Sequence, residues 1–207
     1  MSPLSTGAQA RILAAMRGEL KSAPKASRWK LEVAGVIGSV TLIALAVGAA
    51  LVSSGNADVS VIGARAGVLA MCGLVCAFTA MAALVPGAQR GQAIAVAAFV
   101  VASVALVLMR REVAPSSSPE WVCTVSHLGV GFVPLVIGLV ALRRSDLKLL
   151  AGLALGVAAG TTGAMVGELA CGRDAMHVLL FHVSAWVLMV VAGVVLSRVV
   201  RPRSHAP

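Results

Sequence analysis

Long runs of apolar residues, separated by short polar or basic connections, dominate the chain. The runs fall at roughly Leu31–Ser53, Ile62–Pro86, Gln92–Met109, Cys123–Leu142, Leu149–Ala170 and His177–Val200. Most are close to the roughly 20 residues that a helix needs to cross about 30 Å of hydrocarbon. The pattern predicts an all-α fold, a polytopic membrane bundle of six transmembrane helices in which short connections make successive spans antiparallel.

The distribution of basic residues predicts the orientation of this bundle. Most of the 17 Lys and Arg residues lie before the first span, in the second and fourth loops, and after the last span. The alternate loops hold only Arg65, Arg110, Arg111 and Arg173. Because cytoplasmic loops are enriched in Lys and Arg, both termini are predicted to be cytoplasmic, in a bacterial inner membrane. The predicted organisation is a basic cytoplasmic tail (1–30), a transmembrane domain (31–200) and a second basic tail (201–207).

Composition supports the bilayer as the solvent of this chain. Hydrophobic residues make up 59% of it and charged residues 12%, about half the charged share of a soluble domain. The formal net charge of +9 is placed at the ends of apolar runs, so it indicates topology and membrane lipid rather than direct contact with nucleic acid. The sequence contains no Gly-x-Ser-x-Gly elbow, phosphate-binding loop or His-Glu-x-x-His helix, so we expect no enzyme activity.

The N-terminal tail contains one organised apolar stripe. Its members recur at helical spacing and are Ile12, Leu13, Met16 and Leu20. This stripe is equally consistent with a helix lying on anionic lipid and with a short helix offered to the groove of a partner protein. Trp29, Trp121 and Trp186 are predicted to be interfacial anchors of the spans.

Cysteine and histidine residues gather at the predicted external face. Cys123 and His127 are four residues apart at the start of the fourth span, so they share a helix face. Cys171 ends the fifth span and His177 begins the sixth, which places all four at one membrane depth. These four are the candidate metal ligands. Three neighbours are the expected outer residues of the site: Glu168, Asp174 and His182.

Three interpretations of this group remain open. Cys123 and Cys171 could form a disulfide, because the space outside the inner membrane is oxidising. Two thiolates and two imidazoles could instead hold zinc in a tetrahedral Cys2His2 site. The third interpretation is that the residues are unrelated, the thiols packing as small hydrophobes. A pair of thiols beside imidazoles is also what a sensor of oxidants or thiophilic metals requires, because thiolate is the reactive form.

Two further patterns favour packing over chemistry. Cys72 and Cys76 lie on one face near the middle of the second span, where we expect small apolar packing residues. The fifth span carries small residues at helical spacing, at Gly152, Gly156 and Gly160 and at Gly163 and Gly167. Such stripes allow close helix approach. We favour packing within one bundle over a homo-oligomer face.

A short cytoplasmic head, six spans, a cysteine before the fourth span, and Cys171 followed by His177, His182 and Trp186 resemble the NrsF-type membrane anti-sigma factors. That resemblance implies that the protein sequesters an extracytoplasmic-function sigma factor and releases it on an external stimulus. It also implies that Cys123 and Cys171 are the sensing thiols and that the Ile12–Leu20 stripe binds the partner. A carotenogenesis-type anti-sigma factor, which responds to light-generated oxidants, is a related possibility.

Two alternatives come from other classes of protein. A small membrane redox protein could bind haem through His127, His177 or His182. A small transporter would need a polar site at the membrane midplane, for which the spans offer few residues.

Overall fold

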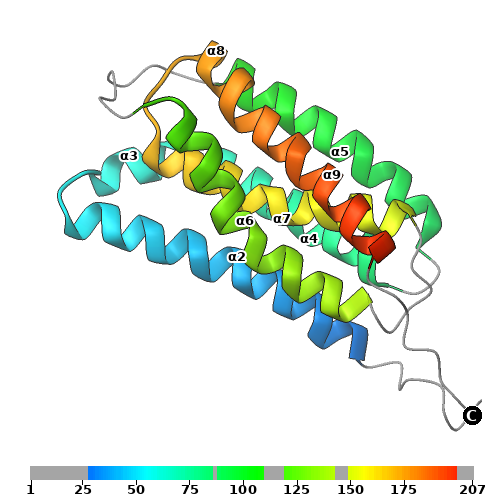
Figure 1. The fold of residues 1–207 in the computed structure, drawn as a ribbon. Coiled ribbons are helices and arrows are strands. Elements are labelled where there is room, and N and C mark those ends of the chain that lie inside the picture. Colours follow the sequence, from blue (N-terminus) through cyan, green and yellow to red (C-terminus); the bar gives the residue numbers. More distant parts are fainter. Residues whose placement is uncertain (1–27, 86–87, 110–118, 143–148, 200–207) are drawn as a thin grey trace, which may run out of the picture.

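The computed structural model describes residues 28–85, 88–109, 119–142 and 149–199. Within them, six apolar segments are helical and long enough to cross a membrane. Five of the spans are α2 (Arg28–Ser53), α4 (Ala66–Leu84), α5 (Gln89–Leu108), α6 (Trp121–Leu142) and α7 (Leu149–Ala170). The last combines α8 (Ala175–His177), η1 (Val178–Val183) and α9 (Ser184–Val199). The protein is therefore a multi-pass inner-membrane helical bundle, and the predicted fold class is confirmed (Figure 1).

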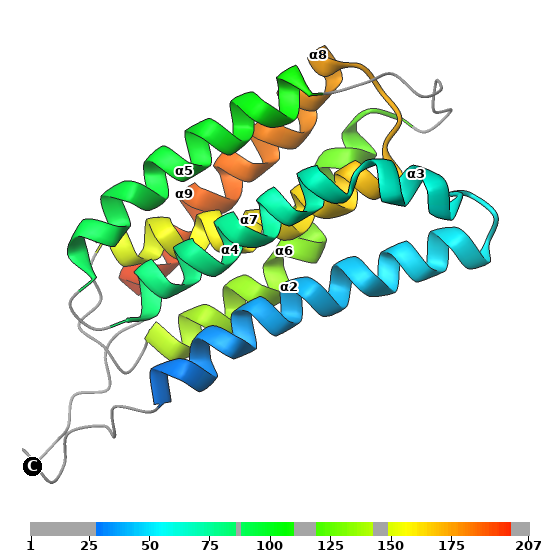
Figure 2. The same ribbon diagram turned by 180° about the vertical axis from the view of Figure 1, so that it is seen from behind.

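Both described ends of the chain lie at the same end of the bundle. The start of α2 and the end of α9 lie together there, whereas α3 (Val59–Ala64), α8 and the start of α6 lie at the opposite end (Figures 1 and 2). Which end faces the cytoplasm stays a prediction from the charge bias. The amphipathic stripe and both basic tails lie outside the described residues, apart from positions 28–30.

The second span begins later than its hydropathy indicates. Asp58 caps the short helix α3, and its side chain accepts a hydrogen bond from the Ser60 amide at 3.3 Å. Arg65 has φ −98° and ψ 0°, which is not helical, and it separates α3 from α4. The apolar run from Ile62 is thus divided into a surface helix and a membrane span.

Helix α7 is the centre of the bundle, because it packs against α2, α4, α5, α6 and α9 (Figures 1 and 2). Its glycines make this possible. A Cβ on Gly156 would lie 2.6 Å from the Cα of Val190 in α9, and a Cβ on Gly152 would lie 2.7 Å from the carbonyl oxygen of Gly193. The preference for packing within the bundle is confirmed.

The tryptophans occupy three different environments. Trp186 is 0% exposed, rests on Gly160, donates from Nε1 to the Val157 carbonyl at 2.9 Å, and meets the Phe99 ring edge-on. The prediction of an interfacial anchor is therefore wrong for Trp186, because a glycine on α7 opens an interior space for its ring. Trp121 is 62% exposed at the start of α6, and Trp29 is half-buried at the start of α2.

The other cysteine pair lies in the core. Cys72 and Cys76 are 0% and 1% exposed and belong to the buried clusters between α4 and its neighbours. Their predicted role as small packing residues agrees with this position. Among the exposed large hydrophobic side chains of the described residues, most are Leu or Val, as expected for helices surrounded by lipid.

A candidate metal and thiol centre

Four ligand-bearing side chains converge at the end of the bundle opposite to the described termini. Cys123 lies in the first turn of α6, Cys171 directly follows α7, His177 ends α8, and His182 lies in η1. Their sulfur and imidazole nitrogen atoms all lie within 4.8 Å of one another. Cys171, His177 and His182 are buried, and Cys123 is half-buried. Two segments that are distant in sequence, the start of α6 and the stretch from Cys171 to His182, therefore build one Cys2His2 group.

Local hydrogen bonds hold these segments in place. Asp174 caps α8, and its carboxylate accepts from the His177 amide at 2.8 Å. Arg65 donates from Nη1 to the Cys171 carbonyl at 3.4 Å, which connects the α3–α4 junction to the end of α7. Thr124 donates from Oγ1 to the Phe181 carbonyl at 3.1 Å, which connects α6 to η1. Asp174 was predicted as an outer residue of the site, and here it positions the backbone of a ligand.

The two histidines converge because η1 is a π-helix. His177 and His182 are five residues apart, a spacing that in an α-helix would separate their directions by about 140°. A π-helix forms its hydrogen bonds between residues five apart, so residues at this spacing lie on one side. Their ring centroids are 5.5 Å apart. The Phe181 ring stacks on His177 at 4.8 Å and covers it.

His127 was predicted as the fourth ligand, but it is not a member of the group. His182 takes its place, so the predicted ligand set is wrong at this one position. Four residues along α6 place His127 about 6 Å deeper than Cys123. There it is 2% exposed, its ring packs directly on Gly163, and its centroid is 6.1 Å from that of His182. The Gly160 carbonyl is nearby, but neither ring nitrogen makes a hydrogen bond within the described part of the chain.

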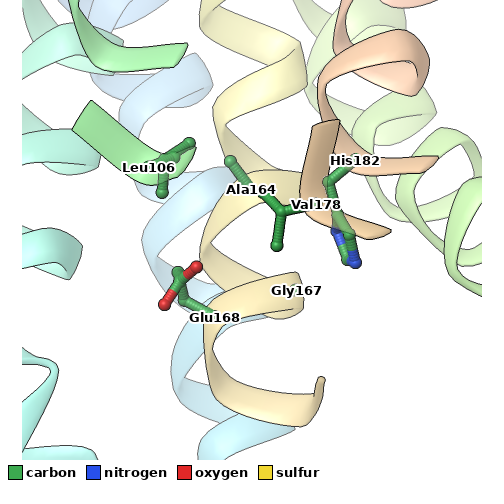
Figure 3. Close-up of a pocket in the computed structure, with 6 residues that line it drawn as sticks. All are labelled: Leu106, Ala164, Gly167, Glu168, Val178 and His182. Atoms are coloured by element: carbon green, nitrogen blue, oxygen red, sulfur yellow. The ribbon is translucent and has the colours of Figure 1, made fainter. Parts of the chain in front are cut away.

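Glu168 lies on the inner side of the group. It lines a small cavity together with His182, Leu106, Ala164, Gly167 and Val178 (Figure 3). The cavity has room for about one water molecule. The ring of His182 lies so close to Gly167 that any side chain there would collide with it. The glycines of α7 thus provide the space for both His182 and His127.

Charged residues border the group on its outer side. Arg173 and Glu120 form an ion pair of 3.1 Å between the α7–α8 connection and the residue before α6.

Sequence reasoning did not identify Thr124, Arg65 or Phe181 as parts of this site. Only Arg65 carried a signal, as a charge near the end of an apolar run.

The chemistry of the group follows from its four donors. In a tetrahedral zinc site, bonds of about 2.3 Å would place two sulfurs about 3.8 Å apart. The donor atoms of the Cys/His group lie within 4.8 Å of one another, so they would need to move only slightly closer together to reach this geometry. The sulfurs of Cys123 and Cys171 are also near enough for a disulfide after a local shift. All four cysteines lie within the described residues, and none of them forms a disulfide there. A closed set of four protein ligands leaves no coordination position for a substrate, which is typical of structural rather than catalytic zinc.

The fold and this group together define a class: a six-span membrane protein with a buried thiol and imidazole centre at one face. The chain is 41% identical over 198 residues to the carotenogenesis protein CarR of Myxococcus xanthus, an alignment that covers 95% of this chain and 90% of the relative. The chain therefore belongs to the CarR family, whose members are transmembrane anti-sigma factors that regulate transcription and are not enzymes.

No family model matches the chain. No solved structure matches it either. Of the two resemblances drawn from the sequence, the carotenogenesis type is confirmed, and the NrsF type stays a prediction.

Proposed function

We propose that this protein holds an extracytoplasmic-function sigma factor at the cytoplasmic face of the membrane and releases it when the external Cys/His group receives an oxidative, metal or light-derived stimulus. The observation that carries the proposal is the 41% identity to CarR over 95% of the chain. A signalling protein of this kind needs a receiving group outside, a responding segment inside, and helices that connect them.

The group of Cys123, Cys171, His177 and His182 is suited to the receiving role. Its thiols are close together, and Cys123 is half-buried, so a small oxidant or a metal ion can reach it. Arg65 donates a hydrogen bond to the Cys171 carbonyl, which holds the end of α7 beside the α3–α4 junction.

Helices α7 and α9 are suited to transmitting a change. Both begin or end near the group, and they pack backbone against backbone through Gly152, Gly156 and Gly193. Such contacts leave no flexible side chain to absorb a displacement, so a shift of η1 is proposed to be passed on to α9 as a whole. The far end of α9, at Val199, lies at the same end of the bundle as the start of α2 (Figure 1).

The responding segment is proposed to be residues 1–30, with Ile12, Leu13, Met16 and Leu20 as the surface that binds the sigma factor. An amphipathic helix in a groove is a recurrent mode of recognition. A tenfold change in partner affinity requires about 1.4 kcal/mol, which is within reach of making or breaking one bond at the external group.

Transcription of the sigma-dependent genes tests this proposal. Replacing Leu13 and Met16 by Asp should leave the protein in the membrane and make those genes constantly active. Replacing Arg11 and Arg17 by Gln, on the other faces of the same segment, is the matched control and should retain repression. If the Asp variant still represses, the tail is not the binding surface. If deletion of residues 1–27 also leaves transcription unchanged, the anti-sigma mechanism is contradicted.

The haem alternative has less support. The three membrane histidines lie near one another, but the cavity beside His182 has room for about one water molecule, far less than a porphyrin occupies. The absorption spectrum of the purified protein provides the test, because bound haem would give a strong Soret band.

A further inference from the structure

We infer that Cys123, Cys171, His177 and His182 bind one tetrahedral metal ion of the Zn²⁺ type, and that η1 is a π-helix because it must present two histidines spaced by five residues. This deepens the proposed function by naming the ligand of the external group. Metal binding can be measured on the purified protein, so its failure is distinguishable from failure of the sigma-factor proposal.

The donor set and its enclosure favour a metal ion. Two thiols and two imidazoles are a usual set for structural zinc, and all four donor atoms lie within 4.8 Å of one another. Two thiolates neutralise the ion, which suits a site near the end of the membrane spans. Cys171, His177 and His182 are buried, so the ion would be shielded from water, and half-buried Cys123 lies on its entry path.

The π-helix is an independent observation that points to the same ligand. π-helices are rare, occur mostly as single turns within α-helices, and are frequently found at functional sites. Here the π-helical turn spans Val178–Val183. His177 immediately precedes this turn, and His182 lies within it. In an α-helical turn the side chain of His177 would instead point about 140° away from that of His182. The described conformation brings both rings to the two thiols.

The surroundings of the site hold the ligands in this arrangement. Asp174 fixes the backbone at His177, and Thr124 binds the Phe181 carbonyl within η1. Groups that orient metal ligands in this way commonly contribute to metal affinity. His182 cannot turn toward α7, because Gly167 lies directly against its ring. Because the four donor atoms lie within 4.8 Å of one another, only a small contraction is needed to bind one ion.

The first test is metal binding by the full chain, purified in detergent with reduced thiols and stripped of metal. Titration with Co²⁺ should give one ion per chain, with the absorption of a tetrahedral cobalt–thiolate site, and Zn²⁺ should displace it. His182→Gln and Cys123→Ser should each weaken Co²⁺ binding at least tenfold. Each variant is first shown to be monodisperse by size-exclusion chromatography.

The matched controls separate this site from the other cysteines and from the remaining membrane histidine. His127→Gln, and the double variant Cys72→Ala with Cys76→Ala, should bind Co²⁺ as the wild type does. Two results would overturn the inference: loss of binding in His127→Gln with retention in His182→Gln, or Co²⁺ binding by the wild type that is no tighter than by Cys123→Ser.

A second test uses the length of η1 and leaves all four ligands in place. Leu179 is 46% exposed, so the change of length is made at a side chain on the surface of the bundle. Deleting Leu179 places the two histidines four residues apart, a spacing that shares a face in an α-helix, and binding should persist. Inserting Ala after Leu179 places them six apart and should abolish it. Loss of binding on deletion, or retention on insertion, would contradict the role assigned to the π-helix.

Discussion

Gly156 of α7 lies against the backbone of Val190 in α9, so closely that a Cβ on the glycine would be 2.6 Å from the Val190 Cα. Backbone atoms cannot rotate away as the end of a side chain can, so Gly156→Ala must push the two helices apart. We expect a loss of about 1–3 kcal/mol of stability, the usual cost of overpacking. Thermal unfolding in detergent measures it.

Gly129 of α6 is the matched control for this substitution, because a Cβ there would meet nothing within 4 Å. Gly129→Ala should leave the unfolding temperature unchanged or raise it slightly, since alanine favours the helix by about 1 kcal/mol. If both variants unfold at the wild-type temperature, the close packing of α7 on α9 is wrong.

Thr124→Val should weaken the Cys/His group without touching a ligand. The change removes the hydrogen bond from Oγ1 to the Phe181 carbonyl in η1, which is worth about 1 kcal/mol. Co²⁺ affinity should fall about fivefold, and Thr124→Ser should restore most of it because it keeps the hydroxyl. Equal affinities in the Val and Ser variants would show that this bond does not hold η1.

The two thiols of the group should be joined readily by oxidation. In a variant with Cys72→Ala and Cys76→Ala, mild oxidation of native membranes should protect both remaining thiols from a maleimide added after denaturation. Protection follows from the 4.8 Å limit on the separation of the ligand atoms. It should decrease when Zn²⁺ is bound first. If reduction after oxidation recovers no labelling, a form of oxidation other than a disulfide has occurred and the expected pairing fails.

The orientation of the bundle can be tested by reporter fusions. Reporters before Met1 and after Pro207 should read cytoplasmic, and a reporter inserted at 116–118 should read external. The reason is the excess of Lys and Arg at the termini and in the second and fourth loops. An external reading at either terminus would place the Cys/His group on the cytoplasmic side, where it could not receive an external stimulus.

The sequence by itself determined the six spans and the end of the molecule at which the cysteines and histidines gather. Both follow from one-dimensional properties. An apolar run of fixed length must cross the bilayer as a helix, and the order of the spans then fixes which ends share a face. Leu149–Ala170 was predicted with its observed bounds for this reason. The same reasoning placed Cys123, Cys171 and His177 together.

Only the tertiary structure decided which histidine completes the group and where Trp186 lies. α-Helical periodicity favours His127, four residues after Cys123, and turns His182 away from His177. The π-helix reverses this choice, and nothing in the apolar pattern of Val178–Val183 indicates it. Trp186 depends likewise on Gly160 of another span. Contacts between helices decide these positions, because every face of an apolar span looks alike in sequence whether lipid or protein covers it.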